Sequence, residues 1–185
     1  MKKLFTMMAA AVVAVSASAQ TVTESKTFDN FYVGINGGVG VKTTGHAWMK
    51  NLDPNAGLRI GRWFTPVFGF AAESNVYFSN KPAPALHTTA RLLNTSLLAT
   101  VNLSNWFAGY KGEPRAFEVI PVYGFGWGHT FGSTTDESLL PNATYAKKNF
   151  LTSKAGIDFA FNLGESKAWQ VYVEPAMLWT LNGLG

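Results

Sequence analysis

Two long segments near the carboxyl end of the chain, 149–163 and 168–180, constrain its fold more than any other feature. In each, apolar residues occupy every second position, as in the run Ile157, Phe159 and Phe161. This period places one set of side chains on each face of a β-strand. Strands of soluble proteins usually have about 5–6 residues, whereas a tilted strand that crosses a bilayer has about 9–11. The two segments therefore predict a hairpin of membrane-spanning strands, each with one apolar and one polar face.

Five earlier segments alternate in the same way, at 31–41, 55–63, 67–78, 89–104 and 117–129. Ile120 and Val122 interrupt the pattern in the last of them, so its two faces are the least clearly defined.

The connections between these segments alternate in length, with short turns at 64–66 and 164–167 and long polar loops at 42–54, 79–88 and 130–147. Outer-membrane barrels have short periplasmic turns and longer outer loops. The connection 105–116 is longer than a turn, and we expect it to form a structured periplasmic loop.

These patterns predict an all-β fold, an antiparallel up-and-down transmembrane β-barrel over 28–181. Seven strands leave two unpaired edges, which a bilayer does not tolerate. Bacterial single-chain barrels have an even number of strands. We therefore expect eight strands in a full-length parent, with seven present here and 182–185 as a truncated end.

Residues 1–19 have the features of a secretory signal peptide. Lys2 and Lys3 precede an apolar run, and Ala17-Ser18-Ala19 forms a small-residue cleavage site before Gln20. The mature chain is then expected to start at Gln20, with 20–27 as a short periplasmic lead-in and the bacterial outer membrane as its location.

Composition excludes several other classes of protein. Only 14% of residues are charged, against roughly 25% in soluble proteins, and no run of 18 apolar residues follows the leader. No basic cluster with interleaved aromatic residues is present, so nucleic acid is not an expected partner. With no cysteine, a disulfide framework and a cysteine metal site are excluded. No cofactor is expected.

Charged residues on the polar faces are predicted to line the interior of the barrel: Arg59, Glu73, Glu118, Lys154, Asp158 and Glu174. An eight-stranded barrel is only wide enough for side chains to fill it, and buried charges must pair. The set fits an inert polar plug, and it fits a gate whose ion pairs rearrange to open a narrow path.

Aromatic residues near the strand ends are candidates for contact with lipid headgroups: Phe31, Trp63, Phe78, Trp127, Trp169 and Trp179.

Catalytic and metal sites have weak support in the sequence. His129 lies near Ser133 and Asp136, the residue types of a lipid hydrolase, but nothing in the sequence fixes their geometry. His46, His87 and His129 fall in three separate loops or strand ends, which makes a poor metal site. The chain is therefore not expected to be an enzyme.

Four stretches resemble the OmpA-like outer-membrane barrels of the Bacteroides–Prevotella group: FDNFYVGINGGVG, NAGLRIGRWFTPVFGFAAES, GYKGEPRAFEVIPVYGFGWGHTF and LTSKAGIDFAFNLG. The resemblance covers most of residues 28–181 and implies an eight-stranded barrel, sometimes followed by a peptidoglycan-binding domain. Members are structural or weakly pore-forming. This chain departs from the family in lacking the eighth strand, the usual terminal aromatic residue and that domain.

The function expected from these observations is a structural role in envelope integrity, accompanied by slow, weak pore activity through a charge-filled lumen. Outer-membrane lipid and lipopolysaccharide are the expected partners, and peptidoglycan would bind only through a domain absent from this chain. A surface adhesin that recognises a host ligand through its outer loops is the alternative, because such loops vary freely and carry contacts. An outer-membrane lipid-modifying enzyme is the third.

Overall fold

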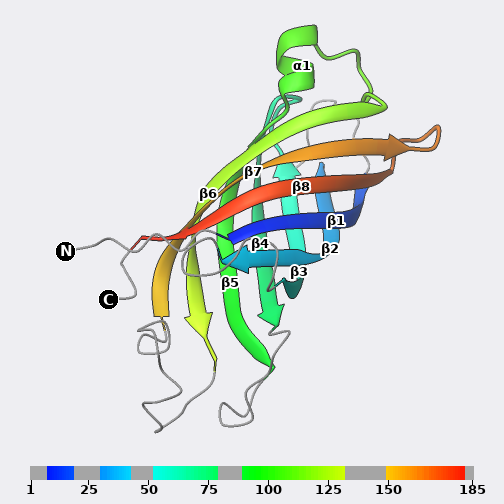
Figure 1. Cartoon of the computed structure of the whole chain (residues 1–185). Coiled ribbons are helices and arrows are strands. Elements are labelled where there is room, and N and C mark those ends of the chain that lie inside the picture. The colour runs from blue at the N-terminus through cyan, green and yellow to red at the C-terminus, as the bar shows by residue number, and fades with distance from the viewer. Residues whose placement is uncertain (1–7, 19–29, 43–51, 79–88, 132–148, 182–185) are drawn as a thin grey trace, which may run out of the picture.

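The computed structural model describes residues 8–18, 30–42, 52–78, 89–131 and 149–181. These ranges contain eight strands and one short helix: β1 (Met8–Ser18), β2 (Phe31–Lys42), β3 (Asp53–Trp63), β4 (Phe68–Phe78), β5 (Ala90–Val101), α1 (Leu103–Ala108), β6 (Phe117–Thr130), β7 (Asn149–Leu163) and β8 (Trp169–Thr180). Strands β2 to β8 form an antiparallel up-and-down sheet in chain order. The predicted all-β class is confirmed (Figure 1).

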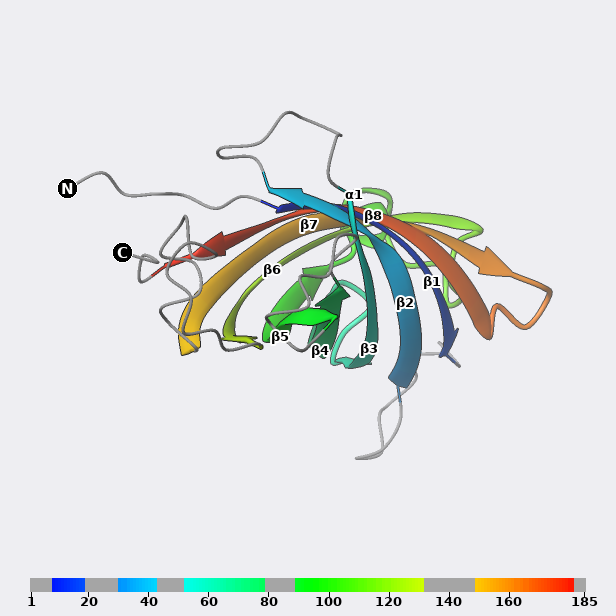
Figure 2. The ribbon, with the colours of Figure 1, turned by 60° about the horizontal axis from the view of Figure 1, so that its bottom comes forward.

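Strand β1 closes the sheet into a barrel. It pairs antiparallel with β2 on one side and with β8 on the other, so that Ala9 lies opposite both Val41 and Met177. Figure 2 shows the sheet curling from β1 and β2 around to β8. The segment predicted to be a leader thus holds the eighth strand position in the barrel, whereas the sequence pattern had placed no strand there.

Strand bounds agree closely with the alternating segments, except after β5. That strand ends at Val101, three residues before the predicted end, and α1 begins at Leu103. Asn102 caps the helix, because its side-chain oxygen accepts a hydrogen bond of 3.0 Å from Asn105 N. The expectation of a structured connection between β5 and β6 is confirmed, but its helix was not predicted. Within the described ranges, no helix has the length and apolar character needed to span a membrane.

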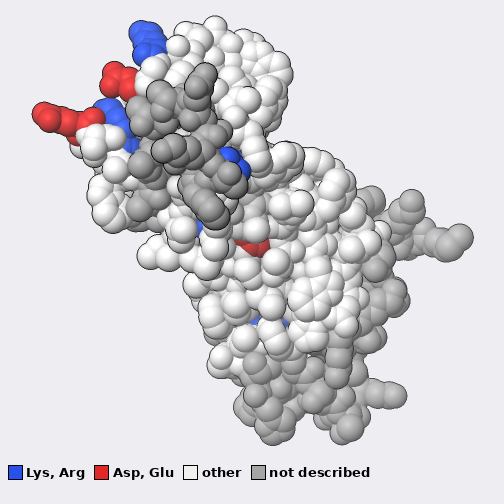
Figure 3. All heavy atoms as spheres, turned by 180° about the vertical axis from the view of Figure 1, so that it is seen from behind, with Lys and Arg blue, Asp and Glu red and all other residues white. Residues whose placement is uncertain are grey.

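The exterior of the barrel is apolar along the middle of its strands. Alternate residues such as Ile35, Leu97 and Phe125 are exposed, and Figure 3 shows a broad uncharged surface below the end of the molecule where most blue and red atoms gather. By the strand period, Val41 shares the outward face of Val39 and Ser153 that of Leu151, yet both Val41 and Ser153 are buried. The Ser153 hydroxyl donates a hydrogen bond of 3.2 Å to Gly124 O; nothing in the described contacts explains Val41.

An apolar layer fills the interior near the turns that join β3 to β4 and β7 to β8. Its buried members are Tyr32, Trp63, Ala71, Leu98, Ile120, Val122, Ala160 and Tyr172. Ile120 and Val122 therefore face inward, and they interrupt the alternation of β6 because this layer requires apolar side chains on the inner face. The rest of β6 faces as predicted, with Glu118 buried and Tyr123, Phe125 and Trp127 exposed.

Three inward aromatic rings lie over a glycine on the neighbouring strand. Tyr32 is opposite Gly61, Trp63 is opposite Gly69, and Phe150 is opposite Gly128. A Cβ atom on any of these glycines would collide with the ring or come within a tight contact of it. Glycine is thus required on these inner faces because the ring occupies the space of a side chain.

We expect Gly61→Ala to destabilise the barrel by about 1–3 kcal/mol, the usual range for inserting a methyl group into a filled core. The added Cβ would meet the Tyr32 ring, which is itself held in the apolar layer. Gly37→Ala is the matched control, because its Cβ would meet only Asn55 O at 3.8 Å. Urea unfolding in detergent compares the two, and equal midpoints would contradict the expectation.

Candidate functional site: a buried network of charges

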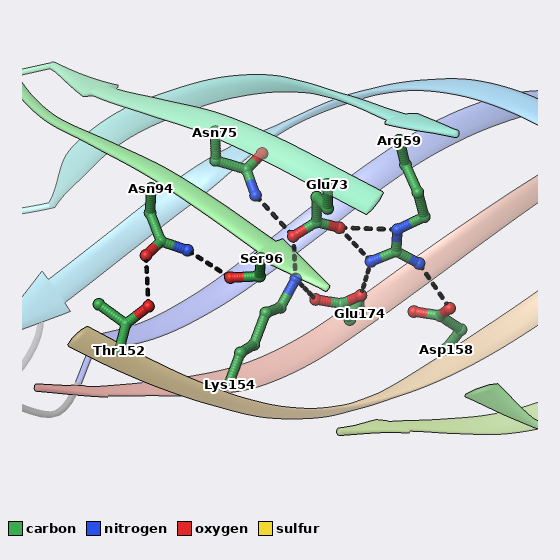
Figure 4. A network of polar contacts seen from close by, with 9 residues as sticks. All are labelled: Arg59, Glu73, Asn75, Asn94, Ser96, Thr152, Lys154, Asp158 and Glu174. Atoms are coloured by element: carbon green, nitrogen blue, oxygen red, sulfur yellow. Dashed lines mark hydrogen bonds and ion pairs between the residues drawn. The ribbon is translucent and has the colours of Figure 1, made fainter. Parts of the chain in front are cut away.

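Five charged side chains from four strands meet inside the barrel. They are Arg59 on β3, Glu73 on β4, Lys154 and Asp158 on β7, and Glu174 on β8 (Figure 4). Each lies on the predicted polar face of its strand, and each is almost fully buried. Alternation therefore directs them inward, and closure of the sheet brings residues of distant sequence positions together.

Arg59 is the centre of the network. It lies directly opposite Glu73 in the β3–β4 register, and its Nε donates a hydrogen bond of 2.7 Å to Glu73 Oε2. Its Nη1 donates to Asp158 Oδ2 at 2.8 Å, and its Nη2 pairs with both Glu73 and Glu174. The planar guanidinium, with five fixed donors, thereby joins three strands through three carboxylates.

Lys154 supplies the second cation. Its Nζ pairs with Glu73 and lies 2.6 Å from Glu174 Oε1. Asn75 Nδ2 donates a further hydrogen bond of 2.6 Å to Glu73 Oε1. Glu73 and Glu174 each bridge both cations, so removing either one would break contacts on more than one strand.

The network contains two cations and three carboxylates, so it carries one excess negative charge when every group is ionised. The Arg59 guanidinium carbon also lies 4.9 Å from the centre of the Tyr172 ring. This cation–π contact was not predicted, although Tyr172 lies on the predicted polar face of its strand. The sequence does hold a signal for it: Tyr172 lies two residues before Glu174, so both side chains point inward from the same face of the strand.

Glu118 is the one predicted interior charge that the structure places apart from the others. It is buried, and its Oε2 accepts a hydrogen bond of 3.0 Å from Asn162 Nδ2. Gln170 continues this chain by donating to Asn162 Oδ1 at 2.8 Å. The expected grouping of six charges is therefore corrected to five, because the register puts Glu118 opposite Ala160 rather than beside a cation.

A second polar chain lies on the opposite side of the network. Thr152 donates to Asn94 Oδ1 at 2.7 Å, and Asn94 Nδ2 donates to Ser96 at 2.8 Å. All three residues are buried. Because they are uncharged, the expectation of paired charges inside the barrel did not include them.

The apolar layer separates the charge network from the polar chain of Glu118, Asn162 and Gln170. Ala71, Tyr172 and Ala160 each lie two residues along the strand from a network carboxylate, on the same face and on the side of the short turns. The apolar layer thus fills the interior between the charge network on one side and the chain of Glu118, Asn162 and Gln170 on the other. The network can hold the strands together electrostatically, and the apolar layer next to it opposes entry of water.

The predicted interfacial aromatic residues differ in exposure and divide into three groups. Phe31, Trp127 and Trp169 are exposed, and Phe78 and Trp179 are half-buried. Trp63 is only 5% exposed and belongs to the apolar layer, so its assignment to the outer surface was wrong. The reason is the strand period itself, because residue 63 shares a face with the inward residues 59 and 61.

His129 lies at the end of β6, where its Nδ1 is 2.8 Å from Asn149 Oδ1. Ser133 and Asp136, the other members of the hydrolase alternative, lie outside the described residues, as do His46 and His87. Within the described ranges, no group of three or more His, Cys, Asp or Glu side chains is arranged to bind a metal ion.

Among the residues that the structure describes, the candidate site is therefore the five-residue charge network (Arg59, Glu73, Lys154, Asp158 and Glu174) next to an apolar layer. Comparison with family models, curated proteins and solved structures finds no match to this chain.

Proposed function

We propose that this protein is an outer-membrane barrel of the OmpA-like kind, with a structural role in the cell envelope and no open channel at rest. The observation that carries the proposal is the inverted distribution of side chains. Charged groups are buried inside, while large apolar residues such as Ile35, Leu97 and Phe125 cover the outside. In water this arrangement would expose the residues that stabilise a fold by burial, whereas in lipid it buries them.

The ends of the barrel support the same assignment. Charged residues that face outward lie near strand ends, as Arg62 does at the end of β3 and Arg91 at the start of β5. Exposed aromatic residues also occur at these levels, for example Trp169 and Trp127. An apolar band with aromatic and charged margins fits a bilayer with two headgroup regions.

The interior favours a structural role over steady conduction. Arg59 and Lys154 are held by at least two carboxylates each, and the apolar layer fills the adjacent level. Conduction would require the network to separate and the layer to move. Slow, weak passage of solute is therefore proposed as a minor activity that depends on the opening of this network.

Spin labels test the membrane assignment. In this cysteine-free chain, single cysteines replace Phe159, which faces outward, or Asp158 and Asn162, which face inward. Labels at Phe159 should collide readily with oxygen, which concentrates in lipid, and poorly with a water-soluble nickel complex. Labels at the inward sites should show low oxygen accessibility. Asn162 keeps the test valid if Asp158→Cys does not fold, because Asn162 is outside the charge network. The reverse pattern at Phe159 and Asn162 would overturn the assignment.

A further inference from the structure

Helix α1 is fixed firmly to the end of the barrel. The buried Asn105 side chain donates a hydrogen bond of 2.9 Å from Nδ2 to Pro66 O in the β3–β4 turn. Ser104 Oγ accepts a bond of 3.0 Å from Val119 N in β6. The Arg115 guanidinium closes the other end of the helix by donating to the carbonyls of Ala108 and Gly109, at 2.9 and 2.6 Å. The orientation of α1 relative to the barrel is therefore defined.

This fixed helix presents two large aromatic side chains outward. Trp106 is 54% exposed and Phe107 is 81% exposed, and their rings stack with centres 6.3 Å apart. A phenylalanine side chain left in water forgoes the stabilisation that its burial would give. The polar contacts of Asn105, Ser104 and Arg115 hold the helix with these rings facing outward.

The aromatic face of α1 is continuous with the exterior of the barrel. The Trp106 ring centre lies 5.4 Å from that of Phe68, which is exposed at the start of β4. Phe64 continues the surface to Phe70, with ring centres 5.8 Å apart. The Arg62 guanidinium lies over the rings of both Phe31 and Phe64, at 5.3 and 5.2 Å. A cation among exposed aromatic rings suits the level at which lipid phosphates meet acyl chains.

We propose that α1 is an interfacial anchor, which places Trp106 and Phe107 in the headgroup boundary of the leaflet at this end of the barrel. The occupant of the aromatic face is lipid, because the same continuous surface covers the barrel exterior. The inference rests on the proposed membrane location and adds a second element that binds the bilayer. Interfacial helices bury their apolar face about 5–10 Å into this boundary, and the fixed orientation of α1 means that it inserts together with the barrel.

Single-tryptophan variants test this anchor. The chain has six tryptophans; one variant keeps only Trp106 and a control keeps only Trp169, which is 58% exposed at the start of β8, with phenylalanine at the other positions. Both are refolded into phosphatidylcholine vesicles with bromine atoms near the headgroup or deep in the acyl chains. Trp106 should be quenched more strongly by the shallow bromines and be poorly accessible to acrylamide in water.

The control separates failure of the anchor from failure of the membrane assignment. Quenching of Trp169 without quenching of Trp106 would overturn the anchor and leave the barrel in the bilayer. Absence of quenching at both positions would overturn the membrane location itself. Access of acrylamide to Trp106 in vesicles would point to another occupant, such as a protein partner, and would also overturn the proposal.

A second measurement retains every tryptophan. A spin label at Phe107→Cys replaces a side chain that is mostly exposed, so that the fold should tolerate it. In vesicles the label should collide with oxygen and be shielded from the nickel complex relative to a label at the exposed Lys111. Equal accessibility of the two labels to the nickel complex would contradict insertion of α1.

Discussion

Arg59→Ala should destabilise the barrel by about 3–5 kcal/mol, the usual cost of removing one partner from a buried ion pair. The size of the effect follows from what remains. Glu73, Asp158 and Glu174 would stay buried with Lys154 as the single cation of the network. Three carboxylates facing one ammonium group would repel one another, and water would enter to solvate them. We therefore expect loss of stability together with a more hydrated interior.

Two measurements on one purified variant distinguish these consequences. Urea unfolding in detergent gives the change in stability, and conductance across a planar bilayer shows whether the interior has opened to ions. Lys111→Ala is the control for loss of a positive charge, because Lys111 is exposed on the connection between α1 and β6. If the urea midpoint and the conductance of Arg59→Ala both equal those of the unaltered chain, Arg59 does not stabilise the interior. The proposal that its ion pairs form a gate would then also fail.

The role of charge balance can be examined with Asp158→Asn. The amide oxygen of asparagine can still accept the hydrogen bond that Arg59 Nη1 donates at 2.8 Å. When every group is ionised, the substitution also removes the excess negative charge from the network. Its cost should therefore be much smaller than that of Arg59→Ala, although both residues are buried.

The sequence predicted seven strands and most of their faces because these long strands repeat one simple period over about ten or more residues. Arg59 and Lys154 fell on inward faces for this reason. Their partners could not be assigned, since Arg59 is 99 residues from Asp158 and 115 from Glu174 in the chain. Such pairings depend on register across several strands and on closure of the sheet, neither of which alternation specifies.

The errors arose where a local pattern had competing explanations. Trp63 was assigned by residue type and position near a strand end, although the strand period already pointed it inward. Helix α1 has six residues, fewer than two turns, so its periodicity is too short to detect. Asn102 was the only local signal, as an N-cap residue three positions before Asn105. The run of small and β-branched residues at 8–18 suits a leader and a strand equally well.

Removal of residues 1–19 should prevent formation of a closed barrel. Strand β1 pairs with β2 along one side and β8 along the other, so its loss leaves both of those strands with an unpaired edge. Each unsatisfied backbone group in the hydrocarbon region costs several kcal/mol, which is far more than one side-chain contact supplies. Residues 20–185, folded in detergent without a partner, should therefore lack the compact, heat-modifiable band that a closed barrel gives on a gel.

A deletion of residues 1–7 is the matched control, because it starts the chain at Met8 and keeps all of β1. That variant should retain the difference in mobility between heated and unheated samples. A synthetic peptide of residues 8–18 added during refolding of 20–185 should restore the difference in part, since it supplies a strand for both edges.

A heat-modifiable band from 20–185 alone would mean that β2 and β8 can pair with each other, and that β1 is dispensable. Mass measurement of the protein isolated from cells then shows whether residues 1–19 are retained: if they are removed and the protein is still heat-modifiable, β2 and β8 pair either with each other or with another strand.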